Sequence, residues 1–257
     1  MIRRTLAVAR VEWLRHLTTP TLYLLWFFLA LIGGFFLLRL IDNFQQLLLR
    51  FGSNPEAAGL HFHERIVVPL VFNMQLVFVL LIPLLTMRSL AVEQEEGSFE
   101  LLAASVLRPQ ELVLGKFLAL SGVVSSLVGV IALQPLVLAW FAEPGSAFDW
   151  MALAGALGGM WLLGLSFAAV GLCASSMTRH SVLAAGGAFM FLLFSWVLRS
   201  GGSGDGFWAE FLPSLSPLTR LESFAVGRLV LADVLYFVSV ISAALVLAVR
   251  FVEGRRW

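Results

Sequence analysis

The chain has 257 residues, of which 60% are hydrophobic and 13% are charged, whereas an ordinary soluble domain has about 25% charged residues. A soluble protein this apolar would precipitate, so the composition excludes that class. The net charge of +1 argues against nucleic-acid binding, and the single Cys173 excludes a disulfide framework and a cysteine-based metal cluster.

Residues 1–19 are predicted to form an amphipathic helix on the inner membrane surface. Their apolar side chains recur at spacings of three and four, at Ile2, Leu6, Ala9, Trp13 and Leu17. Val11 and Leu14 interrupt the polar face, so a basic segment that only sets orientation remains an alternative interpretation.

Six apolar runs follow, each near the length of about 20 residues that a transmembrane helix needs. They cover residues 21–38, 66–87, 117–142, 150–177, 181–198 and 229–250. The first begins only after Pro20, which favours a retained helix over a cleaved signal peptide. The last has almost no polar residues, which disfavours the alternative of a surface helix. The predicted fold is all-α, a polytopic membrane protein with one transmembrane domain over residues 1–257.

The distribution of Lys and Arg predicts the orientation, because cytoplasmic loops are enriched in both. With the N-terminus inside, eleven basic residues lie on the cytoplasmic side and six lie outside. This arrangement places both termini and residues 88–108 in the cytoplasm. Between spans five and six, the pieces 207–213 and 216–224 are too short to cross a membrane, and they are predicted to be short helices at the outer interface.

Known catalytic and metal-binding patterns are weak or missing in the sequence. His61 and His63 have no third partner nearby, so they are a poor metal signal. Gly115-Lys116 lacks the upstream glycine and the downstream Ser or Thr of a phosphate loop. We therefore predict no catalytic, metal or cofactor site in this chain.

The spans carry no ionisable group near their centres, where an ion-coupled carrier would need one. The strongest polar groups there are Asn73, Gln75 and Gln134. They are candidates for a polar translocation path, although hydrogen bonds to neighbouring helices are the commoner use of such residues. Energy for transport would then have to come from another chain.

The cytoplasmic segment 88–108 is unusually acidic for this chain. Glu93, Glu96 and Glu100 lie at spacings of three and four, so a helix would place them on one face. Gly97 would weaken that helix by about 1 kcal/mol relative to Ala, which favours a partner that helps to hold it. A docking surface for a motor is the favoured interpretation, and a solvated acidic loop is the alternative.

Three motifs in a fixed order carry a family resemblance. Pro83-Leu-Leu-Thr-Met-Arg88, Glu93-Gln-Glu-Glu-Gly-Ser-Phe-Glu-Leu-Leu102 and Leu114-Gly-Lys-Phe-Leu118 resemble the permease subunits of type 2 ABC exporters. Ser216-Pro-Leu-Thr-Arg-Leu-Glu-Ser-Phe224, with Asp233-Val-Leu-Tyr-Phe237 and a basic end, is similar to the gliding-motility and nitrous-oxide-reductase-maturation branch. That branch often has His where Arg220 stands, so no role that depends on that His is carried over.

The resemblance implies a permease in the bacterial cytoplasmic (inner) membrane that pairs with a second copy as a homodimer. Two separate ATPase subunits would bind ATP and Mg. Residues 88–108 would form the coupling segment that docks on them, through Glu93, Glu95, Glu96, Gly97, Phe99, Glu100 and Leu102. The competing hypothesis is a membrane scaffold or a lipid-head-group enzyme outside the ABC class. A neighbouring gene for an ATPase with a phosphate loop would discriminate between the two.

Overall fold

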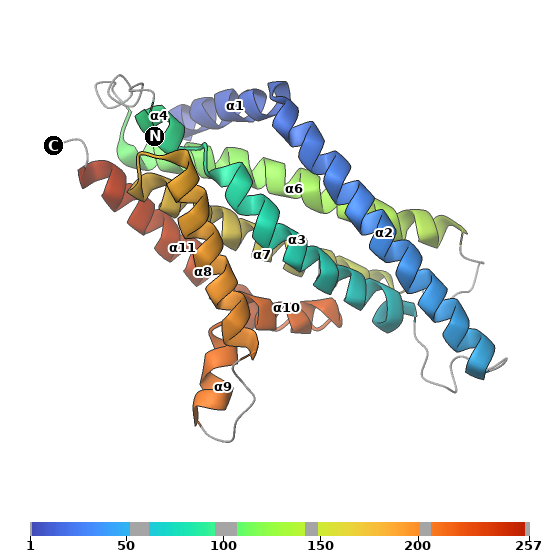
Figure 1. Ribbon diagram of the computed structural model, residues 1–257. Coiled ribbons are helices and arrows are strands. Elements are labelled where there is room, and N and C mark those ends of the chain that lie inside the picture. The colour runs from blue at the N-terminus through green and yellow to red at the C-terminus, as the bar shows by residue number, and fades with distance from the viewer. Residues whose placement is uncertain (1, 52–61, 96–106, 142–148, 201–206, 255–257) are drawn as a thin grey trace.

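The computed structural model describes residues 2–51, 62–95, 107–141, 149–200 and 207–254. Throughout these ranges the secondary structure is helical, with no β-strand (Figure 1). The elements are α1 (Ile2–Thr18), α2 (Pro20–Phe51), the π-helical turn η1 (His63–Val67), α3 (Val68–Thr86), α4 (Ala91–Glu95), α6 (Pro109–Phe141), α7 (Trp150–Met177), α8 (Ser181–Ser200), α9 (Phe207–Ser214), α10 (Pro217–Ala225) and α11 (Leu231–Gly254).

Six of the described helical stretches are long and apolar enough to cross a membrane. They contain α2, α3, α6, α7, α8 and α11, and α3 continues through α4 in the same stretch. The fold class predicted from the sequence is therefore confirmed. The chain is an all-α, multi-pass membrane protein.

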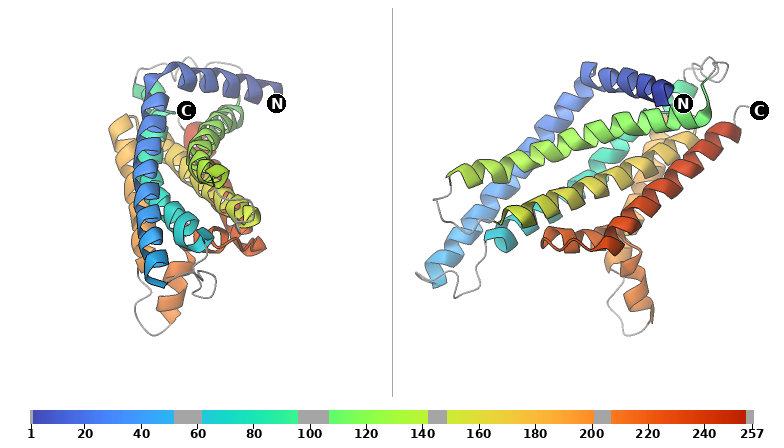
Figure 2. Two further views of the ribbon diagram at one scale, coloured as in Figure 1. Left: turned by 90° about the vertical axis from the view of Figure 1, so that its right-hand side faces the viewer. Right: turned by 180° about the vertical axis from the view of Figure 1, so that it is seen from behind.

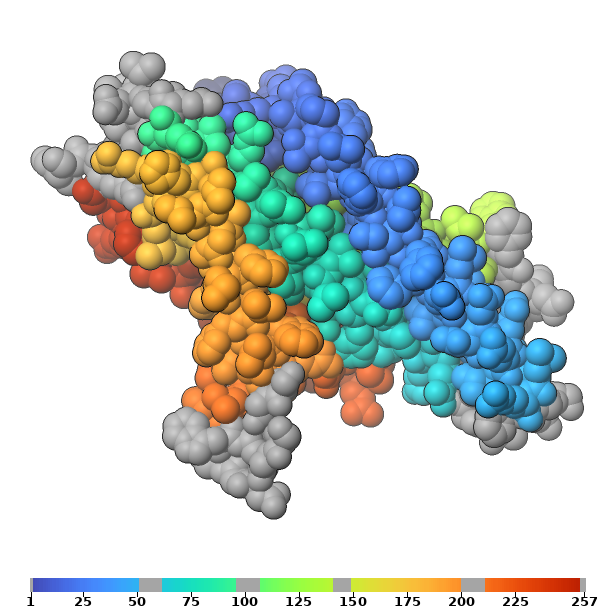
Figure 3. Space-filling model, in the orientation of Figure 1, coloured from blue at the N-terminus to red at the C-terminus, as the bar shows by residue number. Residues whose placement is uncertain are grey.

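Helices α3 and α7 form the centre of the bundle. In each of them 67% of the most apolar 18-residue window is buried, against 17% in α2 and 22% in α8 and α11. Helix α1 lies across one end of the bundle, and α9 and α10 lie at the opposite end (Figure 2). The described chain begins and ends at the α1 end, where α4 also lies (Figure 1). Seen from the side of Figure 1, α8, α3 and α2 lie next to one another (Figure 3).

Small residues of α7 allow the other helices to approach it closely. A Cβ atom on Gly171 would lie 2.1 Å from Oγ1 of Thr86 in α3, and one on Gly159 would lie 2.4 Å from Cβ of Phe224 in α10. Small residues commonly permit such contacts between helices in lipid. Gly159 and Gly171 therefore serve packing within the bundle.

Two helices extend well beyond their predicted spans. Helix α2 continues from residue 38 to Phe51, because residues 39–51 contain neither Gly nor Pro to end it. Helix α6 begins at Pro109 rather than residue 117. The Glu111 carboxylate accepts a hydrogen bond from the Arg108 backbone N–H at 3.0 Å, and Pro109 is well suited to a first helical position. Helix α7 matches its predicted bounds, and the Asp149 side chain caps it by accepting from the backbone N–H groups of Met151 and Ala152.

Candidate functional site

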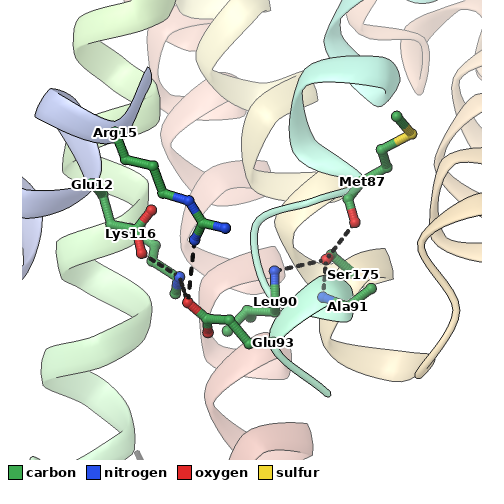
Figure 4. A network of polar contacts seen from close by, with 8 residues as sticks. All are labelled: Glu12, Arg15, Met87, Leu90, Ala91, Glu93, Lys116 and Ser175. Carbon is green, nitrogen blue, oxygen red and sulfur yellow. Dashed lines mark hydrogen bonds and ion pairs between the residues drawn. The ribbon is translucent and has the colours of Figure 1, made fainter. Parts of the chain in front are cut away.

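The start of α4, the first helical part of the coupling segment, is held by a serine from α7. The backbone N–H groups of Leu90 and Ala91 donate to Oγ of Ser175, at 3.0 and 2.9 Å. The same hydroxyl donates to the Met87 carbonyl oxygen at 3.3 Å (Figure 4). A helix leaves its first N–H groups without partners, and an oxygen placed there satisfies them. Ser175 therefore fixes the start of α4 on the central helix of the bundle.

A buried lysine joins three helices at the same place. Lys116 of α6 is 2% exposed. Its Nζ lies 2.5 Å from Oε1 of Glu12 in α1 and 2.6 Å from Oε1 of Glu93 in α4. Figure 4 shows both carboxylates directed at this one amine. The ammonium group therefore ties the surface helix and the coupling segment to a spanning helix.

Arg15 of α1 completes this group, which we call the coupling network: Glu12, Arg15, Glu93 and Lys116. Its Nη1 lies 3.9 Å from Oε1 of Glu93, and its side chain is 48% exposed. The network has two cations and two carboxylates, so it is neutral overall. Removing one member of a buried ion pair leaves an uncompensated charge, which typically costs about 3–5 kcal/mol. Such a network therefore resists separation of the helices that it joins.

Packing between α1 and α6 reinforces the network. A Cβ atom on Gly115 would lie 2.7 Å from Cβ of Val8, and one on Gly122 would lie 2.7 Å from the Trp13 ring. Helix α1 therefore rests on α6, while Ile2 and Leu6 of its predicted apolar face are exposed. Because α1 has both contacts, it is an integral part of the bundle end rather than a free surface helix.

Of the predicted docking residues, Glu93 and Glu95 lie in the described part of the chain and the others do not. Glu93 is 7% exposed and directed inward at Lys116. The spacing of the carboxylates predicted which residues share a helix face, but not the direction in which that face points. Oε2 of Glu95 accepts from the Ser181 hydroxyl at 3.2 Å, next to the start of α8. Glu96, Gly97, Phe99, Glu100 and Leu102 lie outside the described residues, and their docking role stays a prediction.

Sequence reasoning missed the partners of Glu93. Lys116 was considered only as a cytoplasmic charge, a failed phosphate-loop lysine and part of a family motif, and not as a partner for Glu93. Ser175 was not among the candidate residues. Glu12 is 104 positions from Lys116, and a single sequence gives no means of pairing residues so far apart.

Comparison with known protein families identifies the chain. The model of the family described as ABC-2 family transporter protein matches residues 6–219, more than four fifths of the chain. The chain belongs to the ABC-2 transporter family. It is therefore a permease, the membrane component of an ABC transporter, and its family works with an ABC ATPase rather than an ATP site of its own. A comparison with curated protein sequences gave no match.

The candidate path residues of the permease lie on different helices. Gln75 is buried on α3 and Asn73 is half-buried on the same helix. Gln134 of α6 faces α2, where a Cβ on Gly33 would lie 2.3 Å from its Nε2. Within the described part of the chain, neither amide atom of Gln134 nor Oε1 of Gln75 has a hydrogen-bond partner. Their role in a translocation path stays a prediction.

The opposite end of the permease has its own polar cluster. Nη1 of Arg220 in α10 lies 3.0 Å from Oδ1 of Asp233 in α11, and the Ser223 hydroxyl donates to Oδ2 of Asp233 at 2.5 Å. The Arg220 guanidinium also lies over the Tyr236 ring, 5.6 Å from its centroid. The motifs at 216–224 and 233–237, which carry the resemblance to the gliding-motility and nitrous-oxide-reductase-maturation branch, are thus in direct contact. Nearby, Nε2 of His63 donates to the Ala225 carbonyl oxygen at 2.8 Å, so this histidine helps to hold α10.

Proposed function

We propose that the chain is the permease of an ATP-driven exporter in the bacterial cytoplasmic membrane. Two copies would form a homodimer around the substrate path, and two ATPase subunits, carrying ATP and Mg, would dock on the coupling segments. Family membership supports the transporter class. Within that class, the motifs at 216–224 and 233–237 favour the gliding-motility and nitrous-oxide-reductase-maturation branch.

The observation that carries this proposal is the attachment of α4 to three helices. The coupling segment begins where Ser175 and Lys116 bind α4, so a force on that segment acts on α7, α6 and α1 together. Packed helices shift as units rather than deform continuously. ATP-driven movement of the ATPases would therefore reach the spans through these contacts.

The proposed orientation places the α1 end of the bundle in the cytoplasm. Arg3, Arg4, Arg10 and Arg15 lie on α1, and the described chain also ends there (Figure 1). The enrichment of cytoplasmic segments in Arg supports this direction. Under this orientation α9 and α10 lie at the outer face and cover the exit of the path.

The docking role is tested by reversing acidic residues that have no part in the coupling network. Glu96→Lys combined with Glu100→Lys should abolish co-purification of the ATPase, because close charge pairs at interfaces couple by about 1.5–7 kcal/mol and reversal adds repulsion. The membrane level of the permease should stay normal, since no span is changed.

Glu56→Lys combined with Glu143→Lys is the matched control, because both glutamates lie in predicted outer loops. This control should retain the ATPase and its coupled ATP hydrolysis. Retention of both by the Glu96 and Glu100 variant would show that the segment is a solvated loop and would refute the docking role.

A further inference from the structure

A small cavity lies at the junction of α1 and α2, next to the last turn of α3. Its volume is about 90 Å³, and its polar wall comprises Glu12, Arg15, His16, Thr19, Arg88 and Ser89. Thr21 and leucines of α2 and α3 form the rest of the wall. Drug-sized ligands need about 300–1,000 Å³, so this cavity suits a single small group.

The cavity carries an excess of positive charge. Of its charged lining groups, the Glu12 carboxylate is bound by Lys116 at 2.5 Å, and Nη1 of Arg15 lies 3.9 Å from Oε1 of Glu93. Arg15 and Arg88 line the cavity from α1 and from the end of α3. Arg88 forms no ion pair with a carboxylate in the part of the chain that the structure describes. Two guanidinium groups beside a small cavity favour an anion with several oxygens.

Neutral donors complete the wall. The Ser89 side chain is 8% exposed, and its hydroxyl has no hydrogen-bond partner among the described residues. Burial lowers the pKa of His16, with Lys116 and Arg15 acting in the same direction and Glu12 opposing them. His16 is therefore a neutral imidazole at pH 7, with one N–H to donate. A buried hydroxyl left without a partner costs about 1–3 kcal/mol, which a bound anion would recover.

We propose that this cavity binds the phosphate group of an anionic membrane lipid. It lies where the surface helix turns into the first span, the level of lipid head groups, and Leu22, Leu84 and Leu85 give its wall an apolar part. This placement rests on the proposed orientation of the permease. A bound head group would join the α1–α2 junction to Arg88, the first residue of the coupling segment, and so brace the coupling network against the membrane.

Lipid binding to the purified, delipidated complex tests this proposal. Native mass spectrometry would count bound dioleoylphosphatidylglycerol and dioleoylphosphatidylcholine per complex during titration. The wild type should bind the anionic lipid roughly tenfold more tightly or more. A difference of about tenfold in affinity corresponds to the smallest free energy usually found for a hydrogen bond to a charged group. Arg88→Gln should lose most of that preference, and Ser89→Ala should weaken the binding of both lipids a few-fold although no charge changes.

Arg10→Gln is the matched control, since it removes one exposed charge from α1 outside the cavity. Equal losses in the Arg10 and Arg88 variants would show diffuse attraction and overturn the proposal. Displacement of the lipid by millimolar inorganic phosphate, with no preference between the lipids, would assign the cavity to free phosphate and overturn the lipid assignment. Because the assay needs neither transport nor ATP hydrolysis, its failure is distinct from failure of the proposed function.

Discussion

The two ends of the permease both use ion pairs, but they join different kinds of elements. At the coupling end, Lys116 is 2% exposed and links residues 104 and 23 positions away on two other helices. At the opposite end, the Arg220 side chain is 33% exposed and its partner Asp233 is only 13 positions away. The first arrangement can carry force between separate helices, whereas the second holds one short helix in place. This difference predicts which substitutions disturb coupling and which disturb only local structure.

The largest effect is expected from Lys116→Met. It leaves the Glu12 and Glu93 carboxylates close together with only the half-exposed Arg15 as a nearby cation, which should destabilise the permease by about 3–5 kcal/mol. Thermal unfolding of the purified complex would measure this loss. The triple variant Glu12→Gln, Glu93→Gln, Lys116→Met removes the three buried charges and leaves only the half-exposed Arg15, so it should recover most of the stability, since neutral replacement of a buried ion group is often tolerated. No recovery would mean that Lys116 acts through packing alone.

A smaller effect is expected from Arg220→Gln at the opposite end. Asp233 keeps the Ser223 hydroxyl as a donor, so the loss should be about 1–3 kcal/mol, the cost of one unpaired buried group. ATPase co-purification and coupled ATP hydrolysis should remain normal, because α10 lies at the opposite end of the bundle from α4 (Figure 1). Uncoupling by this variant would contradict the division of roles between the two ends.

The smallest effect on stability is expected from Ser175→Ala. This change removes the oxygen that caps α4, and loss of a cap costs about 0.5–2 kcal/mol. Ser166→Ala is the control, because Ser166 is also buried on α7 but its hydroxyl donates only to the Leu163 carbonyl of its own helix. Coupled ATP hydrolysis should fall in the Ser175 variant and not in the Ser166 variant. Equal rates in the two would show that the cap is not used in coupling.

The spans were predictable because their signal is local. The bounds of α7 follow from an uncharged run that begins directly after Asp149. The short helices α9 and α10 follow from two pieces that mix aromatic and charged residues and are too short to span a membrane. The extension of α6 to Pro109 was missed because the predicted span began only after Lys116, which was counted as a cytoplasmic charge. The helical placement of Glu111 and Lys116 depends on a cap at Arg108 and on the burial of Lys116 by other helices.

The coupling network was not predictable for a related reason. Periodicity predicted that acidic residues of the segment share one face, but the direction in which Glu93 points is set by Lys116, Glu12 and Arg15 on two other helices. Charge pairing of this kind depends on tertiary structure. The same limit applies to the cavity beside Arg88, whose walls come from two stretches far apart in the chain, 12–22 and 84–89.

The central claim is that α4 moves with α6 as one unit during the ATPase cycle. Spin labels on Glu95→Cys of α4 and Gln110→Cys of α6, in a Cys173→Ser background, would report their separation by double electron–electron resonance. The account predicts one narrow distance that is the same without nucleotide and after trapping with ATP and vanadate, and a broad distribution in Lys116→Met. A shift of a helical turn, about 5.4 Å, between the two states of the otherwise unchanged protein would contradict the claim.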